Sequence, residues 1–314
     1  QAVLVDQADV LRLYPDPDAT ALKQAIATQQ KVDITQVFVG NGSDEVLAHI
    51  FKAFFIQNEP LLYPDISYSF YPVYSQFFGI NTQQIPLNEN FEINVADYSR
   101  ENGGIVIANP NAPTSIALGL DQIEQMLKAN PDRVVVIDEA YVDFGAVSAV
   151  QLVNQYDNLV VCQTTSKSRS LAGLRVGFAI AQAHLIVALE AVKNSFNSYP
   201  IDRFAIAAAV ASFEDQSYLE DQCQKVISCR EQLVMDLTAL GFQVLPSKAN
   251  FIFVSHAQYA AADLAQQLRE HGIIVRYFNK ARINQFLRIT VGTEQQNVRL
   301  VETLTMQILN KAVN

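Results

Sequence analysis

Charged residues and cysteines are both scarce in this sequence. Only 17% of its 314 residues are Asp, Glu, Lys or Arg and three are cysteine, whereas 50% are hydrophobic. This composition excludes a disordered, collagen-like or coiled-coil chain. The three cysteines, Cys162, Cys223 and Cys229, include no C-x-x-C pair, so neither a disulfide framework nor a structural zinc site is supported. We therefore expect a protein of the reducing cytoplasm with a large buried core.

Long apolar runs and basic stretches are also missing. No apolar run reaches the roughly 18 residues that span a bilayer, and no basic segment followed by an apolar one opens the chain. With 22 Lys and Arg against 32 Asp and Glu, the net charge is −10, so the molecule as a whole repels nucleic acid and anionic membranes. Small anions can still bind where a few arginines converge. Because the chain begins with Gln1 rather than Met, we expect that further residues precede it.

Short β-rich segments alternate with helical ones along the first two thirds of the chain. This alternation is typical of an α/β protein in which helices cover a mostly parallel sheet. The segment Val134–Asp138 is apolar without alternation, as expected of a central strand that is covered on both faces. We predict seven strands in this sheet: Gln36–Val39, Leu61–Tyr63, Ile80–Ile85, Ile105–Ala108, Val134–Asp138, Leu159–Thr164 and Arg175–Ala181.

The pattern changes after a long predicted helix that ends at Gly241, a residue type that favours helix ends. The helices predicted up to that point are Asp44–Ile56, Tyr68–Phe78, Gln122–Lys128, Arg203–Ser212 and Tyr218–Leu240. The elements predicted beyond it are strands Gln243–Leu245, Phe251–Val254 and Phe286–Val291 with helices Ala260–His271 and Glu294–Leu309. We therefore predict a large domain over residues 16–227 and a smaller α+β domain over residues 228–314, completed by residues 1–15.

Two strand ends carry polar residues that suggest a ligand site. The turn Gly40–Asp44 lies between a strand and a helix, where backbone N–H groups can face a phosphate, although an ordinary turn capped by Ser43 or Asp44 fits as well. Asp138 ends the central strand and, if it is buried there, needs a cation or a donor; the alternative is a helix cap or a solvated side chain. Tyr141 follows on the same turn. The four histidines are dispersed, and we expect no metal.

Lys167 follows another predicted strand among hydroxyl residues. A lone lysine at such a place is usually a solvated surface residue, but Thr164, Ser166 and Arg175 surround this one as they would surround a phosphate. An amine held among cations is biased towards its neutral, nucleophilic form. A lysine for an aldehyde, a carboxylate for a ring nitrogen, a phosphate cradle and a stacking aromatic such as Tyr68 together meet the needs of pyridoxal phosphate.

These residues belong to longer stretches that resemble a known family. The sequence is similar to the fold-type I pyridoxal-phosphate aminotransferases, and most closely to their histidinol-phosphate aminotransferase subgroup. The similar stretches, which together cover nearly the full length, are Leu13-Tyr14-Pro15, Gly-Ser-Asp-Glu, Pro-Asn-x-Pro-Thr, Asp-Glu-Ala-Tyr, Ser-Lys…Leu-Ala-Gly-Leu-Arg-x-Gly-Phe and Leu-Arg-Ile-Thr-Val-Gly-Thr. The stretch from Ser166 to Phe178 is specific for the fold type, and the stretch from Gly272 to Thr293 carries the resemblance to the subgroup.

The resemblance implies a role for each matching residue. Lys167 would form a Schiff base with pyridoxal phosphate and move the proton at the substrate Cα, while Asp138 would pair with the ring nitrogen. Tyr141 would bond the ring hydroxyl. Tyr68 would stack on the ring. The implied contacts to the rest of the cofactor come from the backbone of Gly42, Ser43 and Asp44 and from Thr164, Ser166 and Arg175, together with Tyr14 of a neighbouring subunit. Such a Tyr14 implies a homodimer with shared active sites.

Two arginines match the substrate-binding positions of the subgroup. Arg288 would hold the acidic group of the substrate, and Arg276 would be the additional arginine for a substrate phosphate. Two guanidinium groups suit a phosphate dianion better than one does. The implied reaction transfers the amino group between L-histidinol phosphate and 2-oxoglutarate, giving imidazole-acetol phosphate and L-glutamate, a step of histidine biosynthesis. Arg276 could equally be an ordinary surface residue of a strand.

The sequence departs from the family at three places. Ala112 stands where relatives commonly have an asparagine that contacts the ring oxygen, so Asn111 or Asn109 would replace it, or Tyr141 would act alone. Ser115 replaces the usual glycine, and the family's N-terminal Asn/Pro/Tyr segment is absent from this chain. Three alternatives share the fold: an aromatic amino-acid aminotransferase, a phosphothreonine-type decarboxylase, and a non-catalytic ligand-binding domain as in some transcription regulators. The lack of a basic DNA-binding segment and the complete set around Lys167 argue against the last.

Overall fold

The larger of two sheets has seven strands and dominates the computed structural model, which describes residues 9–309. Strand β7 runs antiparallel to both its neighbours, whereas the remaining strand pairs are parallel. The strand predicted to be central, β5, is the fourth of the seven. In spatial order the strands are β1 (Val37–Asn41), β7 (Val176–Ala181), β6 (Leu159–Thr164), β5 (Val135–Asp138), β4 (Gly104–Ala108), β2 (Leu61–Pro64) and β3 (Thr82–Ile85).

Helices cover both faces of this sheet, which is why its central strands are apolar without alternation. Consecutive residues of β5 enter opposite cores: Val135 and Ile137 belong to one, and Val136 belongs to the other. The first core is closed by α2 (Thr20–Gln30), α5 (Leu120–Ala129) and α7 (Arg203–Glu214). The second core is closed by α3 (Ser43–Phe54), α4 (Tyr71–Phe78) and α6 (Ala183–Phe196). The sheet and these six helices form what we call the large region.

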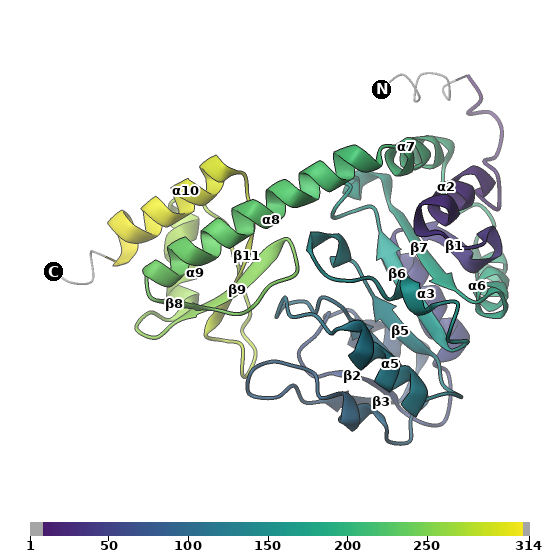
Figure 1. The fold of residues 1–314 in the computed structure, drawn as a ribbon, viewed down its shortest axis with the longest axis horizontal. Helices are drawn as coiled ribbons and strands as arrows, with labels where there is room; N and C mark the ends of the chain where they lie inside the picture. The colour runs from purple at the N-terminus through teal and green to yellow at the C-terminus, as the bar shows by residue number, and fades with distance from the viewer. Residues whose placement is uncertain (1–8, 310–314) are drawn as a thin grey trace.

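A four-stranded antiparallel sheet forms the small region, together with α9 (Ala261–Glu270) and α10 (Glu294–Thr303). Its strands, in spatial order, are β10 (Arg276–Tyr277), β11 (Phe286–Thr290), β9 (Phe251–His256) and β8 (Phe242–Val244). After α10 the chain continues as a π-helix over Leu304–Leu309. Figure 1 shows the small region beside the large one, at the opposite end of the molecule from α2 and α6.

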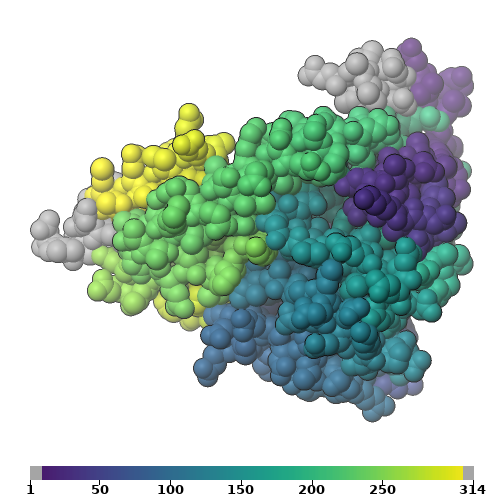
Figure 2. All heavy atoms as spheres, viewed as in Figure 1, coloured from purple at the N-terminus to yellow at the C-terminus, as the bar shows by residue number. Residues whose placement is uncertain are grey.

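The helix α8 (Gln216–Ala239) belongs to both regions. Its first half packs Leu219 and Cys223 against Phe144 of the large region, and its second half contributes Leu233 and Leu237 to the core of the small region. Figures 1 and 2 show this green helix along one side of the molecule, from α7 to the small sheet. The boundary that we predict between residues 227 and 228 therefore lies inside one continuous helix.

The N-terminal residues lie elsewhere than we expected. The carbonyls of Leu13 and Tyr14 accept hydrogen bonds from Arg203 of α7, and the carbonyl of Pro17 accepts one from the buried Lys193 of α6. The described part of the segment 1–15 thus contacts the large region, because these carbonyls satisfy cations on α6 and α7 rather than groups of the small sheet. Residues 1–8 lie outside the described residues.

Candidate active site

The functional residues meet where the parallel strands β5 and β6 end. Asp138 is the last residue of β5 and is paired in register with Cys162 of β6, and Lys167 follows the end of β6 by three residues. A cavity opens at this edge of the sheet, the usual place for a ligand in an α/β protein. Its lining residues are Ser43, Asp44, Leu47, Tyr68, Ala108, Pro110, Ala112, Asp138, Ala140, Tyr141, Thr164, Ser166, Lys167, Ala172 and Arg175.

Asp138 is a buried carboxylate with hydrogen-bond donors but no cation bonded to it. Its Oδ2 accepts from the hydroxyl of Tyr71 at 2.8 Å, and its Oδ1 accepts from the N–H of Ala140 at 3.3 Å. Burial raises the pKa of Asp138 to about 6, although the two hydrogen bonds oppose this shift. A protonated ring nitrogen in the cavity would supply the missing positive charge.

Tyr71 is the one partner of Asp138 that our reading of the sequence missed. It is fully buried in α4, and burial together with the negative charge of Asp138 raises its pKa, so its hydroxyl stays protonated and donates. Its ring lies edge-on to that of Tyr68, with 5.5 Å between the centroids. A tyrosine three residues after the predicted stacking residue was the available signal, because the helix predicted over Tyr68–Phe78 would place both on one face, although α4 itself begins only at Tyr71.

Lys167 and Tyr141 face each other across the cavity. The Nζ of Lys167 lies 5.4 Å from the centroid of the Tyr141 ring. Within residues 9–309, neither the amine of Lys167 nor the hydroxyl of Tyr141 forms a hydrogen bond or ion pair with another side chain or the backbone, so both remain available to a ligand. Thr164 donates its hydroxyl hydrogen to Ser166 Oγ at 3.0 Å, which fixes the turn that leads to Lys167.

The predicted phosphate cradle is built by close contact between backbones. Gly42 precedes α3 with φ of 84°, and a Cβ there would lie 2.5 Å from Nη2 of Arg175. A Cβ on Gly177 of β7 would lie 2.2 Å from the backbone N of Ser43. No side chain caps the first turn of α3, so its N–H groups face the cavity edge where an anion binds favourably.

The side chains around the cradle form one connected group. The Asp44 carboxylate accepts from the Tyr68 hydroxyl at 2.9 Å and lies 3.1 Å from Nη2 of Arg175. Both charged side chains of this pair are about half exposed, at 50% for Asp44 and 45% for Arg175. Only the backbone of Asp44 was predicted to contact the ligand, and its carboxylate instead orients Tyr68 and Arg175.

The structure does not bring Asn111 into the cavity. Its side-chain N–H₂ donates to the carbonyl of Ile66 and to Thr114 Oγ1, and its Oδ1 accepts from Ser67. Asn109 is likewise bonded to the backbone of Leu118 through both side-chain atoms. The side-chain amide of Asn111 therefore joins its own loop to the loop of Ile66 and Ser67, and the cofactor contact that we predict for this residue has no free donor. The cavity wall at this place is Ala112.

Arg276 and Arg288 lie side by side in the small sheet. They are direct cross-strand partners on β10 and β11, and within the described residues neither guanidinium has a hydrogen bond or an ion pair. The Cζ of Arg288 lies 5.1 Å from the ring centroid of Phe251, and that ring lies edge-on to Tyr141 at 5.0 Å. Arg288 is thus connected to the cavity through one pair of aromatic rings, whereas the guanidinium of Arg276 lies near Phe278, at 5.5 Å from its ring centroid.

Tyr14 does not line the cavity. Its ring stacks on Tyr199 with 4.7 Å between the centroids, and 77% of the residue is exposed. Nearby apolar residues are exposed too, including Phe196 at 82% and Leu13 at 47%.

The described residues place no cluster of three or more His, Cys, Asp and Glu where it could hold a metal ion. Over the same residues, no helix has the length and hydropathy needed to cross a membrane.

Comparison with known proteins identifies the family of this chain. The sequence profile described as "Aminotransferase class I and II" matches residues 3–304. The chain belongs to the class I and II aminotransferases. A protein of Acinetobacter baumannii named histidinol-phosphate aminotransferase is 80% identical to this aminotransferase over 309 residues, which cover 98% of the chain and 86% of that protein. The predicted family is thereby confirmed.

Solved structures confirm the predicted fold. A histidinol-phosphate aminotransferase from Clostridium acetobutylicum has a TM-score of 0.90 at 23% identity, covering 98% of this aminotransferase and 96% of that chain. One from Sinorhizobium meliloti, in complex with pyridoxal-5′-phosphate, scores 0.87 at 23% identity and covers 100% and 87%. An L-threonine-O-3-phosphate decarboxylase from Porphyromonas gingivalis scores 0.81 at 23% identity and covers 96% and 95%. The fold of this aminotransferase therefore does not determine its reaction.

Proposed function

We propose that this aminotransferase uses pyridoxal phosphate to transfer the amino group between L-histidinol phosphate and 2-oxoglutarate. The products are imidazole-acetol phosphate and L-glutamate, and the reaction is a step of histidine biosynthesis. The observation that carries the proposal is the 80% identity, over almost the whole chain, to a protein named for this activity. The paired arginines of the small sheet also support it, because two guanidinium groups suit the phosphate of the substrate.

The residues around the cavity fit pyridoxal phosphate. Asp138 is a buried carboxylate to which no cation of residues 9–309 is bonded, and a Cβ on Gly177 of the cradle would collide with the backbone of Gly42 and Ser43. Lys167 has a free amine. When bound, the cofactor supplies an aldehyde and a ring that accepts electrons from the substrate Cα. The phosphate would be held by the start of α3, Ser166 and Arg175, and the ring by Tyr68, Asp138 and Tyr141.

Each of these side chains then has a defined task. The negative charge of Asp138, oriented by Tyr71, would keep a proton on the ring nitrogen. The amine of Lys167 would hold the aldehyde and, when free, would move a proton between the substrate Cα and the cofactor C4′. Tyr141 would donate its hydroxyl hydrogen to the ring oxygen, and Tyr68 would hold the ring from one face.

The substrate anion would be bound by Arg288 and Arg276. L-Histidinol phosphate has no carboxylate, so its phosphate dianion is the group that these guanidinium groups can hold. Glutamate would present a carboxylate to the same arginines in the other half of the reaction, so that both substrates use one pocket in turn. Two unpaired cations on neighbouring strands repel each other, and a shared dianion between them removes that repulsion.

The shared active site of a homodimer belongs to this proposal as well. Tyr14 is exposed and is accompanied by exposed Leu13, Phe196 and Tyr199 on the same side of the large region. An apolar surface of this kind favours contact with a second copy, from which Tyr14 would reach the cofactor phosphate of its neighbour. The three free cysteines fit a cytoplasmic location.

The decisive experiment compares two amino donors. Glutamate formation by the cofactor-loaded protein is measured with 2-oxoglutarate and either histidinol phosphate or phenylalanine. A kcat/KM ratio above about 100 in favour of histidinol phosphate, equivalent to about 2.7 kcal/mol, supports the proposal. Equal kcat/KM values for the two donors would be consistent with transamination but would assign the protein to the aromatic amino-acid aminotransferases. Release of carbon dioxide from phosphothreonine without an oxo-acid would identify the decarboxylase instead.

A further inference from the structure

One buried arginine lies close to the active site without lining its cavity. Arg230 is on α8, and only 3% of its side chain is exposed. Its Nη1 donates to the carbonyls of Phe144 at 2.8 Å and Ala249 at 2.9 Å. Its Nε and Nη2 donate to Oε1 of the largely exposed Glu231. A cation with so little contact with water needs such partners, since an unpaired buried charge is costly.

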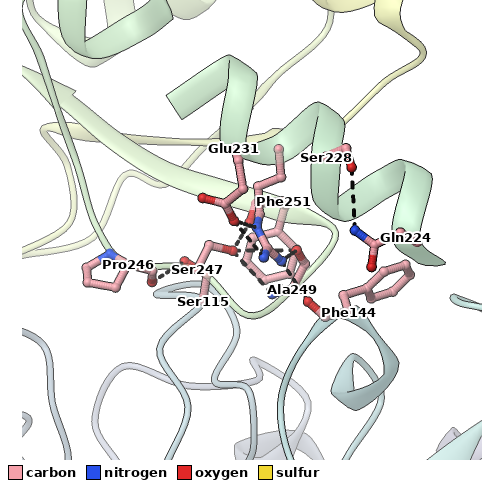
Figure 3. A network of polar contacts seen from close by, with 10 residues as sticks. Ser115, Phe144, Gln224, Ser228, Glu231, Pro246, Ser247, Ala249 and Phe251 are labelled. Carbon is pink, nitrogen blue, oxygen red and sulfur yellow. Dashed lines mark hydrogen bonds and ion pairs between the residues drawn. The ribbon is translucent and has the colours of Figure 1, made fainter. Parts of the chain in front are cut away.

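The two carbonyls belong to different regions of the molecule. Phe144 ends a short 3₁₀ helix of the large region, η3 (Val142–Phe144), which begins directly after Tyr141. Ala249 lies in the small region, two residues before Phe251 begins β9. Figure 3 shows Phe144, Ala249 and Glu231 converging on one side of α8. Arg230 therefore joins two segments: the one that follows Tyr141 and the one that precedes Phe251.

The rings at the other ends of these two segments touch each other. Tyr141 and Phe251 lie edge-on with 5.0 Å between their centroids. Lys167 lies over the far side of this pair, at 5.4 Å from the Tyr141 centroid, and Arg288 lies at 5.1 Å from the Phe251 centroid. The pair of rings thus separates the amine that reacts from the guanidinium that would hold the substrate anion, and Arg230 holds the backbone on both sides of the pair.

A second set of bonds strengthens the same joint. The N–H of Lys248 donates to the carbonyl of Ser115 at 3.0 Å, and Ser115 Oγ donates to the carbonyl of Pro246 at 3.2 Å. Ser247 Oγ donates to the carbonyl of Phe251 at 2.6 Å. Figure 3 shows Ser115, Pro246 and Ser247 beside the group around Ala249. The segment 246–251 is consequently fixed to the large region from two sides, and Arg230 is the charged member of this joint.

We propose that Arg230 is a positioning residue that sets the distance between Tyr141 with Lys167 on the cofactor side and Arg288 on the substrate side. The inference rests on the proposed function, because it assumes that Arg288 binds the substrate anion. Its physical basis is that reacting groups must be held within a fraction of an ångström, whereas the two groups here come from separate sheets. A charge-assisted hydrogen bond to each segment provides that restraint.

The test replaces Arg230 and follows both sides of the ring pair in the cofactor-loaded enzyme. For Arg230→Met we expect KM for histidinol phosphate to rise by about 10- to 100-fold, since Arg288 is displaced relative to the reacting amine. We also expect a shift in the pH midpoint at which the absorption of the bound cofactor changes, because the Tyr141 hydroxyl moves. Arg230→Lys, which keeps the charge but loses the planar fork, should show both effects to a smaller extent.

A double-variant cycle separates positioning from general stability. If Arg230 acts through Tyr141, the midpoint shift caused by Arg230→Met is absent in a Tyr141→Phe background, whereas a purely structural role leaves the two effects additive. A lower melting temperature combined with an unchanged KM and an unchanged midpoint would overturn the proposal. If Arg230→Met does not fold, Glu231→Gln decides: Glu231 is 60% exposed, and the loss of its charge should raise KM by about fivefold.

Arg282 provides a matched control. It also connects the two regions, through Asp65 at 2.8 Å and through the carbonyls of Leu87 and Asn88, but it contacts neither Tyr141 nor Phe251. Arg282→Lys should leave the absorption midpoint unchanged. The same midpoint shift in Arg282→Lys would mean that any loosening between the regions suffices, and the role assigned to Arg230 would fall. The absorption measurement needs no substrate, so a wild-type enzyme that rejects histidinol phosphate contradicts the proposed function and leaves this test intact.

Discussion

The large and small regions present their functional groups in opposite ways. In the large region Asp138 is buried and bonded to Tyr71 and to the backbone of Ala140. In the small region Arg288 is only half buried, and Arg276 is exposed. Neither arginine has a bonded partner within residues 9–309. Within the described residues, the carboxylate of Asp138 is thus held by hydrogen bonds before any ligand binds, whereas the two arginines, like the amine of Lys167, are left with free hydrogen-bond donors.

The difference follows from the two kinds of sheet. A mostly parallel sheet is covered on both faces, so a side chain at a strand end is surrounded by packed residues and holds one position. The antiparallel sheet packs one face on α8, α9 and α10, and Leu287 and Ile289 of β11 point into that core. Arg288 lies between them in sequence and points to the other face. The proposed substrate-binding residues can therefore be replaced on the small sheet while Asp138 keeps its bonds in the large region.

The largest effect should come from the large region. Among residues 9–309, Lys167 supplies the only amine placed over Tyr141 at the cavity, so for Lys167→Ala we expect kcat to fall by about 10⁴-fold or more. The bound cofactor should also lose the absorption band that depends on its bond to the lysine. Single-turnover absorbance with glutamate measures both. Near-normal transamination by this variant would exclude the assigned role of Lys167.

Asp138→Asn tests whether the buried charge serves function at the expense of stability. Burial raises the pKa of Asp138 from 3.8 to about 6, so the folded cofactor-free protein binds a proton more tightly than the unfolded chain does. Stability should then fall as the pH rises from about 4 to about 6, by up to about 3 kcal/mol above that range.

Asp138→Asn should lack this loss of stability at higher pH. We expect cofactor-free Asp138→Asn to melt at a higher temperature than the wild type at pH 7 and at an equal temperature near pH 4, while kcat falls by about 100-fold or more. Thermal unfolding at the two pH values and steady-state kinetics provide the measurement. Equal melting temperatures at pH 7 would show that the carboxylate is already neutralised by its hydrogen bonds.

Substitutions in the small region should change recognition alone. Arg288→Gln is expected to raise KM for histidinol phosphate by about 100-fold, since a charged hydrogen bond to the substrate is worth about 1.5–3 kcal/mol. Arg276→Gln should raise KM for histidinol phosphate by a similar or smaller factor. KM for phenylalanine should stay unchanged. The absorption spectrum of the bound cofactor should match the wild type in both. An altered spectrum would show that substitutions in the small region also change the cofactor environment in the large region.

Ser115 lies on the joint between the regions, and its effects should be the smallest. Its φ of 65° is a conformation that glycine adopts more easily, but its hydroxyl lies within hydrogen-bond distance of the carbonyls of Thr114 and Pro246. Ser115→Ala keeps the strained backbone and loses the bond, so the free energy of unfolding should fall by about 1 kcal/mol. Ser115→Gly relieves the strain as well, and we expect a change of less than about 1 kcal/mol. Urea unfolding distinguishes the pair.

Sequence patterns predicted the large sheet well because its strands are short apolar runs between turn residues. Two helices were missed for identifiable reasons: α2 has few apolar residues on its buried face, namely Leu22, Ile26 and Ala27, and α6 is apolar nearly all round at its start. The helix predicted from Tyr68 begins only at Tyr71, because Pro72 favours the first turn of a helix. Boundaries of this kind depend on local backbone geometry that a hydrophobic pattern does not record.

At the active site, the residues that line the cavity were predictable from their positions at strand ends and from the resemblance to a family. Their supporting residues were not. Tyr71, which bonds Asp138, and Arg230, which bonds two backbone carbonyls, act through contacts between segments far apart in sequence. Asn111 shows what a position in the sequence does not record: both N–H groups of its side chain donate within the protein, to Ile66 of a neighbouring loop and to Thr114 of its own.

The length of α8 gives the molecule a mechanical property. A helix of 24 residues is about 36 Å long at 1.5 Å per residue, and it is embedded in the large region at one end and in the small region at the other. A tilt of only about 3° at the embedded end of such a rod moves its far end by about 2 Å. A displacement of that size would break the bonds that join the two regions, among them those of Arg230 and the ion pair of Arg282 with Asp65, so these bonds restrain the far end of the helix.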